Sequence, residues 1–424
     1  MSGLFADLTP LRENPAYRRL GSGLSLGNVG QQLAVVAISL QVYDLTGSSF
    51  AVGLVGLFGV VPLVVLGLYG GSLVDAHDRR TVALTASLVM WGVSIATAIQ
   101  AWLGLRSVWL LYALVAVQSA AFAVNNPARQ AIVPALVRRE LLPAANALTT
   151  VSFTLGMAVG PLLGGVLVGR FGFRAAYSID AVTYLAALWG VFRLPSLPPQ
   201  GERSRPGLRS VLEGLRFLGT RPNVRMTFLV DLAAMILASP RALLPAVGAV
   251  VLGGGAVTAG ALLSAAALGS VLAGLFSGRL GGVHRQGLAV LVCVTCWGAA
   301  IAAFGVVLAL TPSGAAGDGK VSALFWPAAA CLVAAGAADA VSAVFRSTIL
   351  QVATPDAMRG RLQGVFVVVA GGPRLGDLVA GTAADTVGIA ATAIAGGLAC
   401  VIVVLVLARL QPMFAAYDSR RPTP

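Results

Sequence analysis

Residues 288–310 read LAVLVCVTCWGAAIAAFGVVLAL, a run without a single charged side chain. An α-helix rises about 1.5 Å per residue, so a run of this length can cross the roughly 30 Å hydrocarbon core of a bilayer. The rest of the sequence is similar, because 57% of the 424 residues are hydrophobic and only 11% are charged. Soluble proteins carry about a quarter charged residues. The sequence therefore predicts an all-α integral membrane protein.

Comparable apolar runs occur on both sides of a central polar segment, and we predict about twelve transmembrane helices in two sets of six. The first set covers 20–43, 50–69, 81–101, 108–127, 146–169 and 175–193. The second set covers 224–250, 256–278, 287–310, 322–345, 362–384 and 387–409. The predicted domains are an N-terminal half (1–193), a cytoplasmic linker with an amphipathic surface helix (194–222) and a C-terminal half (223–424).

The positions of the basic residues predict the orientation. With the N-terminus inside, the predicted cytoplasmic segments hold twenty-three arginines, two arginines lie within helices, and four basic residues remain outside: Arg106, Arg170, Arg174 and Lys320. Cytoplasmic loops collect Lys and Arg, so both termini should lie in the cytoplasm. The same topology accounts for the net charge of +13 without a nucleic-acid partner.

Motifs for other chemistry are weak. The single lysine, Lys320, has no glycine-rich phosphate loop before it, which argues against ATP hydrolysis. Cys293 and Cys296 have C-x-x-C spacing but lie inside an apolar run without a nearby histidine. We interpret them as packed thiols and expect no metal, no cofactor and no enzymatic activity.

The two halves resemble each other. A shift of 217 residues places Arg129 on Arg346, and a shift of 207 places His77 on His284. Each half therefore looks like a copy of the other. This pattern is typical of transporters with two parallel six-helix halves and a substrate cavity between them near the midplane.

Three groups of residues carry a family resemblance. Residues 71–80, GSLVDAHDRR, resemble the signature between helices two and three of the major facilitator superfamily, although Asp78 replaces the usual glycine. Helix five resembles the G-P-x-x-G-G signature of proton-coupled exporters in that superfamily. NPAYR at 14–18, TPDAMRGR at 354–361 and GD at 376–377 are similar to its enterobactin exporter branch. The resemblance implies the major facilitator fold and export by alternating access.

The first signature predicts a conformational latch on the cytoplasmic side. A carboxylate at this loop can bind a helix N-terminus and nearby arginines when that side is closed, and release them when it opens. The second-half copy has Gly282 where Asp75 would repeat. The predicted latch residues are Gly71, Asp75, Arg79, Arg80 and Arg361.

The helix-five motif comprises Gly156, Gly160, Pro161, Gly164 and Gly165. Glycines four residues apart line one face of a helix and let a neighbouring backbone approach closely. Pro161 removes one helical hydrogen bond. We therefore predict a packing role, and only the resemblance implies an antiporter-specific function.

Ionisable residues inside apolar runs are the strongest functional signal, because each costs about 2.5–3.5 kcal/mol at a helix centre. Such residues occur in the C-terminal half, and we predict that Asp377, modulated by Arg374, carries a coupling proton. Alternatively, these two residues simply neutralise each other. Asp180, near the outer end of helix six, is interpreted as interfacial. The remaining proton-coupling candidates are Asp231, Asp339 and Arg241.

Uncharged polar residues mark the N-terminal half. They could line a cavity that hydrogen-bonds an amphipathic solute, or they could bond one helix to another. The substrate-cavity candidates are Asn28, Gln31, Gln32, Gln118, Asn125 and Asn126.

The function predicted first is proton-coupled export of a siderophore-like or drug-like amphiphile across the cytoplasmic membrane by a monomer. A broad multidrug exporter is the second possibility, and a membrane scaffold or sensor that transports nothing is the third. The intact latch signature argues against the scaffold.

Overall fold

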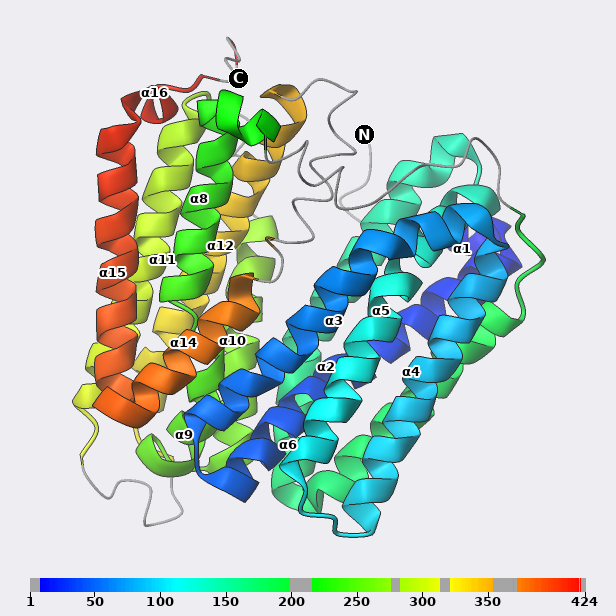
Figure 1. Cartoon of the computed structure of the whole chain (residues 1–424), viewed down its shortest axis with the longest axis horizontal. Helices are drawn as coiled ribbons and strands as arrows, with labels where there is room; N and C mark the ends of the chain where they lie inside the picture. The colour runs from blue at the N-terminus through cyan, green and yellow to red at the C-terminus, as the bar shows by residue number, and fades with distance from the viewer. Residues whose placement is uncertain are drawn as a thin grey trace. The chain divides into compact units, whose positions relative to one another are not determined.

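The computed structural model describes residues 8–198, 216–275, 283–312, 321–353, 369, 372–418 and 420. Within these ranges the side chains of residues 68–72, 74–76, 139, 351 and 353 are outside the description. Every regular element in the described part of the chain is helical (Figure 1). The all-α prediction is therefore confirmed.

The first part of the chain forms six α-helices and one 3₁₀ turn. Their bounds are α1 Thr9–Glu13, α2 Pro15–Thr46, α3 Ser49–Ala76, α4 Arg79–Trp102, α5 Val108–Leu136, η1 Arg139–Leu141 and α6 Leu142–Phe192.

The remainder of the described chain forms helices α8 to α16, with two short irregular helical turns after α8. Their bounds are α8 Pro222–Leu237, η2 Arg241–Leu243, α9 Leu244–Ala246, η3 Val247–Val251, α10 Gly255–Leu275, α11 Gln286–Ala309, α12 Phe325–Ala353, α14 Gly372–Val387, α15 Ile389–Leu410 and α16 Pro412–Ala415.

Ten helical segments in the described residues are long and apolar enough to cross a membrane. One of them, α6, has 51 residues and contains Gly172 in a left-handed conformation (φ 76°). Glycine adopts this conformation without steric cost, so the chain turns there. The break lies between the predicted helices 146–169 and 175–193. Because α14 has only 16 described residues, the count of twelve stays a prediction.

The chain divides into two compact units. The first contains residues 1–41 and 58–207, and the second contains residues 42–57 and 208–424. In the first unit α4 packs against both α5 and α6. A cluster of buried aliphatic side chains, including Leu20, Ala83 and Ile132, fills its interior.

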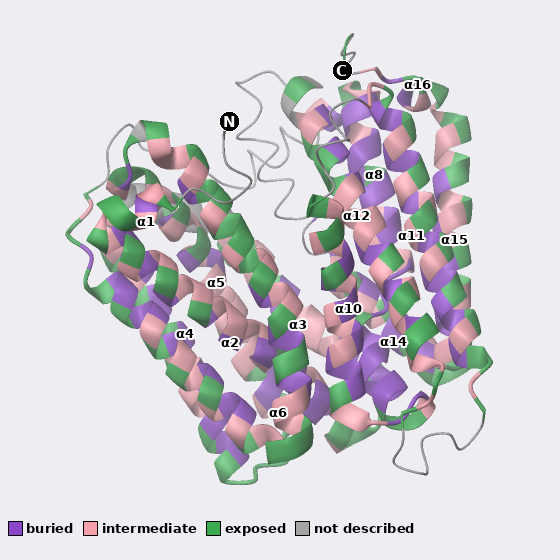
Figure 2. Cartoon of the chain, turned by 180° about the vertical axis from the view of Figure 1, so that it is seen from behind, coloured by how far each residue is buried: buried purple, intermediate pink, exposed green. Residues whose placement is uncertain are grey.

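In the second unit α11 packs against α12 and α15, and α10 packs against α12. The segment 222–251 is the most deeply buried of the candidate spans, as the colouring of α8 shows in Figure 2. The sequence predicts one continuous helix over 224–250, but α8 ends at Leu237 and a short turn follows. Pro240 lacks an amide hydrogen and its ring clashes with the preceding turn, which explains the break.

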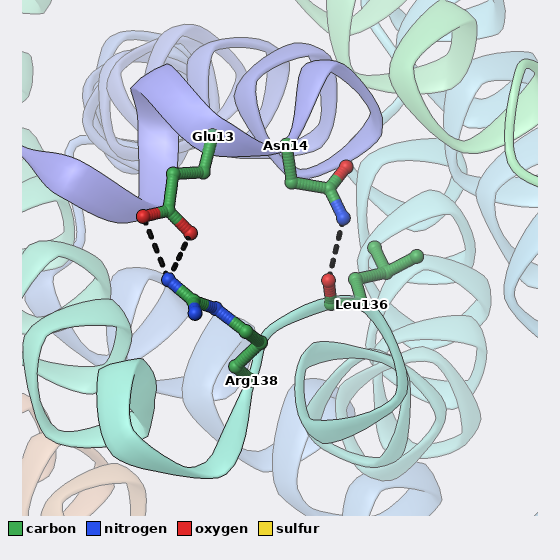
Figure 3. Close-up of polar contacts among 4 residues, drawn as sticks. All are labelled: Glu13, Asn14, Leu136 and Arg138. Atoms are coloured by element: carbon green, nitrogen blue, oxygen red, sulfur yellow. Dashed lines mark hydrogen bonds and ion pairs between the residues drawn. The ribbon is translucent and has the colours of Figure 1, made fainter.

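The NPAYR motif joins the start of α2 to the end of α5 (Figure 3) and, through Tyr17, to the start of α6. The amide oxygen of Asn14 caps α2 by accepting from Ala16 N (2.8 Å), and its amide nitrogen donates to Leu136 O (2.5 Å). The Tyr17 hydroxyl donates to the backbone oxygen of Ala145 (3.0 Å). Glu13 next to the motif pairs with Arg138 (2.6 Å). These contacts give the motif a structural role.

Candidate functional site

The second unit contains a buried ion pair between helices α8 and α12. Asp231 on α8 pairs with Arg346 on α12, and both residues are only 8% exposed. The same guanidinium also donates a hydrogen bond from Arg346 Nη2 to Asp339 Oδ1 (3.3 Å). Arg346 therefore neutralises a buried acid and also reaches a second, half-exposed one.

Asp377 on α14 has a different environment. Its carboxylate accepts a hydrogen bond from the Ser239 hydroxyl (2.7 Å), in the break after α8. Arg241 and Arg374 lie close enough to interact electrostatically with this carboxylate. In the described part of the chain neither arginine forms a direct ion pair with Asp377, so the predicted mutual neutralisation of Arg374 and Asp377 is at most a longer-range effect.

The two groups are connected through Arg241, which also interacts electrostatically with Asp339. We call this set the charge network. It consists of three acids and three bases on α8, η2, α12 and α14: Asp231, Asp339, Asp377, Arg241, Arg346 and Arg374. In a low-dielectric surrounding, ionised groups are retained only where opposite charges and hydrogen bonds compensate their lost hydration. A proton added to one acid would therefore alter the balance of all six.

The sequence analysis did not single out Arg346 as a site residue. The sequence counted it among the cytoplasmic basic residues, because it follows the apolar run 322–345. The helix α12 instead continues to Ala353 and carries Arg346 into the packed interior. Asp231, a proton-coupling candidate from the sequence, is also buried.

The glycine motif of helix five lies against α2. A side-chain carbon added at Gly156 would come within 3.3 Å of Asn28, one at Gly160 within 3.0 Å of the Val29 carbonyl, and one at Gly164 within 3.0 Å of the Leu33 carbonyl. Pro161 and Gly165 are buried in the same helix. The two backbones therefore approach closely here, and the candidates Asn28 and Gln32 lie at this contact between helices.

The other polar candidates of the first unit have different surroundings. Asn125 is buried and donates to the Ser87 hydroxyl (3.0 Å), so it bonds α5 to α4. Asn126 is exposed, while Gln31 and Gln118 are half-buried. The side-chain oxygen of Gln118 is buried, with no hydrogen-bond partner in the described residues.

Asp180 is buried among helices, whereas the sequence analysis interpreted it as an interfacial polar residue. It is only 4% exposed, within α6 and close to Gly30 of α2. Ser94 of α4 is the hydrogen-bonding group beside its carboxyl. The expected outer end of the helix is here covered by α2 and α4, which explains the difference.

The predicted latch is only partly described. The surroundings of Gly71 and of the Asp75 side chain, at the end of α3, and the whole of Arg361 lie outside the description. Arg79 donates to the backbone oxygen of Ala131 (3.1 Å), and Arg80 donates to that of Phe192 (2.8 Å). Carbonyls near helix C-termini are favourable partners for cations. Both arginines thus have partners within the first unit, and the latch stays a prediction.

Asp78, the departure from the family signature, has a definite role in the structure. Its carboxylate accepts from the backbone of Thr81 (2.9 Å), which caps α4, and from Ser196 Oγ (2.5 Å) and Leu197 N (2.7 Å) after α6. Burial raises the pKa of Asp78, but the hydrogen bonds from Ser196, Thr81 and Leu197 outweigh burial and lower the pKa below its ordinary value of 3.8. A glycine could form none of these bonds.

We expect Asp78→Ala to lower the free energy of unfolding by about 1 kcal/mol, the usual effect of losing an N-cap. Because the folded pKa is depressed, the stabilisation is fully present above pH 3.8 and is lost as the pH falls through the folded pKa. Thermal unfolding of the purified protein between pH 7 and pH 3 measures this. Asp78→Asn keeps an acceptor for Thr81, so its stability should lie between that of the wild type and that of Asp78→Ala. Equal stability of all three proteins at pH 7 would contradict the role.

Comparison with known proteins agrees with the motifs. The family model described as "Transmembrane secretion effector" (MFS_3) matches residues 5–422. The enterobactin exporter EntS of Citrobacter koseri is 30% identical over 420 residues, which is 99% of this chain and 97% of that protein. The Shigella boydii exporter of the same name is 32% identical over 361 residues, covering 85% of this chain and 83% of that protein.

Solved structures share the fold at low sequence identity. A peptide transporter POT in complex with alafosfalin has a TM-score of 0.73 at 13% identity, covering 96% of both chains. A mutant of the nucleoside transporter NupG has a TM-score of 0.72 at 13% identity, covering 93% of this chain and 99% of that chain. The match along nearly the whole sequence, the helical architecture and these structural neighbours together show that the chain is a multi-pass membrane transporter, not an enzyme, and belongs to the transmembrane secretion effector family of the major facilitator superfamily.

Proposed function

We propose that this transporter is a proton-coupled exporter of a siderophore-like amphiphile. It acts as a monomer in the cytoplasmic membrane, with both termini in the cytoplasm. The relatives named as enterobactin exporters support a siderophore substrate. The excess of arginines in the predicted cytoplasmic segments supports the orientation.

The charge network is the observation that carries the proton-coupling proposal. A proton carrier must be an acid whose ionised form is favoured in one conformation and disfavoured in another. Asp231 is paired directly with the guanidinium of Arg346. The direct partners of Asp377 are uncharged, namely the Ser239 hydroxyl and the Ala242 backbone, and its two arginines lie at longer range. Asp377 is therefore the carrier that we favour, with Asp231 and Asp339 as alternatives.

Transport would then follow from competition for Asp377. When Arg241 lies near, it and Arg374 together stabilise the carboxylate, and when Arg241 moves away a proton replaces it. The α14 helix carries both Arg374 and Asp377, so a shift of this helix against η2 changes the distance to Arg241. The charge network therefore couples the two events: protonation of Asp377 promotes the shift of α14, and the shift of α14 promotes protonation.

A multidrug exporter is the competing function, because uncharged polar groups such as Gln118 could bond many solutes. The test uses cells that make a catecholate siderophore but lack their own exporter. Expression of this chain should restore siderophore secretion and lower its intracellular concentration, without increasing resistance to a panel of amphiphilic drugs. Drug resistance without siderophore secretion would favour the multidrug exporter. If expression changes neither siderophore secretion nor drug resistance, the result contradicts export of both substrate classes.

A further inference from the structure

The start of α3 is bonded to a carboxylate far away in the sequence. Asp385, in the last turns of α14, accepts hydrogen bonds from Ser49 N (2.9 Å) and Phe50 N (3.2 Å), and from the Ser48 hydroxyl. The two amides are among the first of α3, where the N–H groups lack partners within the helix and the helix dipole attracts an anion. Asp385 thus supplies an anion to α3 from 336 residues away.

The helix does not need this carboxylate in order to form. Ser48 already caps α3, because its hydroxyl oxygen accepts from Ala51 N (3.2 Å). Ser is among the preferred capping residues. The bond to Asp385 therefore adds a connection between α3 and α14 beyond what the start of α3 requires.

The backbones of the two helices also touch. A carbon added at Gly53 would come within 2.6 Å of the Asp377 carbonyl oxygen, and one at Gly56 within 2.9 Å of the Arg374 carbonyl oxygen. One at Gly381 would collide with the backbone of Ser49. We call this contact, formed by residues 48–56 and 374–385, the α3–α14 seam. All of it lies within the second unit, which includes residues 42–57.

The seam joins segments that belong to opposite halves of the sequence. Residues 48–56 lie in the N-terminal half, before the linker 194–222, whereas α14 lies in the C-terminal half, after it. In the proposed orientation the start of α3 and the end of α14 both face the outside. A transporter that works by alternating access must break the contacts between its halves on one side and then reform them.

We propose that Asp385 is an outer latch, which holds the α3–α14 seam shut and must release Ser48, Ser49 and Phe50 before the site opens to the outside. The inference rests on the proposed orientation and transport function. Asp385 is exposed, so water can replace its partners when the seam opens, and contacts of this kind are weak enough to break in each cycle. The same helix carries Arg374 and Asp377, so the latch and the charge network move together.

The test measures accessibility and needs no substrate. In a protein whose four native cysteines are replaced by alanine, Ser49→Cys introduces a small change at a side chain that is 2% exposed. A membrane-impermeant maleimide added outside intact cells should label it slowly. Adding Asp385→Ala should increase the labelling rate by about fivefold, the factor expected for loss of one capping interaction.

Asp44→Asn is the matched control, because Asp44 is an exposed acid in the last turn of α2 and does not share the contacts that Asp385 makes with the start of α3. It should leave the labelling rate unchanged. An unchanged rate in Asp385→Ala, or an equal increase in Asp44→Asn, would overturn the latch. The labelling rates do not depend on siderophore or protons. A failure of the latch can therefore be distinguished from a failure of the proposed function.

A second measurement replaces the latch with a covalent bond. Ser48→Cys combined with Asp385→Cys should form a disulfide on oxidation, since the two side chains are bonded in the structure. Oxidation should stop siderophore export and also protect buried seam positions from labelling, and reduction should reverse both. Continued export with the disulfide formed would contradict the proposal.

Discussion

Replacing Arg346 with methionine should destabilise the protein by about 3–5 kcal/mol, the cost of leaving a buried charge without its partner. Asp231 and Arg346 are both buried and directly paired, so the variant strands the aspartate inside the helical interior. Thermal unfolding in detergent micelles measures the loss. The melting temperature should fall well below that of wild type.

A double-mutant cycle separates the ion pair from the size of the side chain. Asp231→Asn combined with Arg346→Met removes both charges, and it should be more stable than Arg346→Met alone. Arg170→Met removes an exposed arginine and should change stability by less than about 0.5 kcal/mol. If the double variant is as unstable as the sum of its single variants, the pair does not stabilise the fold in the way described.

Replacing Asp377 with asparagine should abolish substrate-dependent proton movement while leaving substrate exchange intact. Asparagine has the shape of the protonated acid and can still accept from Ser239, so the fold should be maintained. It cannot bind or release a proton. Proteoliposomes with an entrapped pH indicator measure the proton movement, and counterflow of labelled substrate measures exchange.

Asparagine substitutions of the other two acids of the charge network provide the comparison for this prediction. Asp339→Asn removes a half-exposed acid, and it should retain coupling in the presence of Asp377. Full proton coupling in Asp377→Asn would transfer the role to Asp231 or Asp339. Coupling in all three single variants would remove these aspartates from the proton pathway.

Helical organisation was readable from the sequence because the bilayer imposes a length on every span. The predicted boundary between 146–169 and 175–193 coincides with the turn at Gly172. The break after Leu237 was missed, although Pro240 signals it. Hydrophobicity alone treats 224–250 as one run, since a proline changes the hydrogen bonding but scarcely changes the average polarity.

The acids and two arginines of the charge network were also readable, because charge within an apolar run is rare. Arg346 and Ser239 were missed for different reasons. Arg346 follows the apolar run directly, and sequence cannot tell how far the helix carries it into the interior. Ser239 is uncharged and becomes important only through its 2.7 Å contact with Asp377.

Contacts between segments distant in the sequence could not be predicted. Asp78 was visible as a departure from the signature, but its partners Ser196 and Leu197 lie after α6. Asp385 gave no sequence signal at all, because an acid near a helix end is ordinary. Their roles depend on which helix ends meet in the folded chain, and a single sequence does not encode that in any local pattern.

The most direct test of proton-coupled export is substrate accumulation in proteoliposomes with an imposed pH gradient. The wild-type protein is reconstituted, and labelled catecholate siderophore is added outside vesicles with an acidic lumen. If protons leaving the lumen drive siderophore into it, siderophore should accumulate above its external concentration, and a protonophore should abolish the accumulation. Equal siderophore levels with and without the pH gradient would contradict the account.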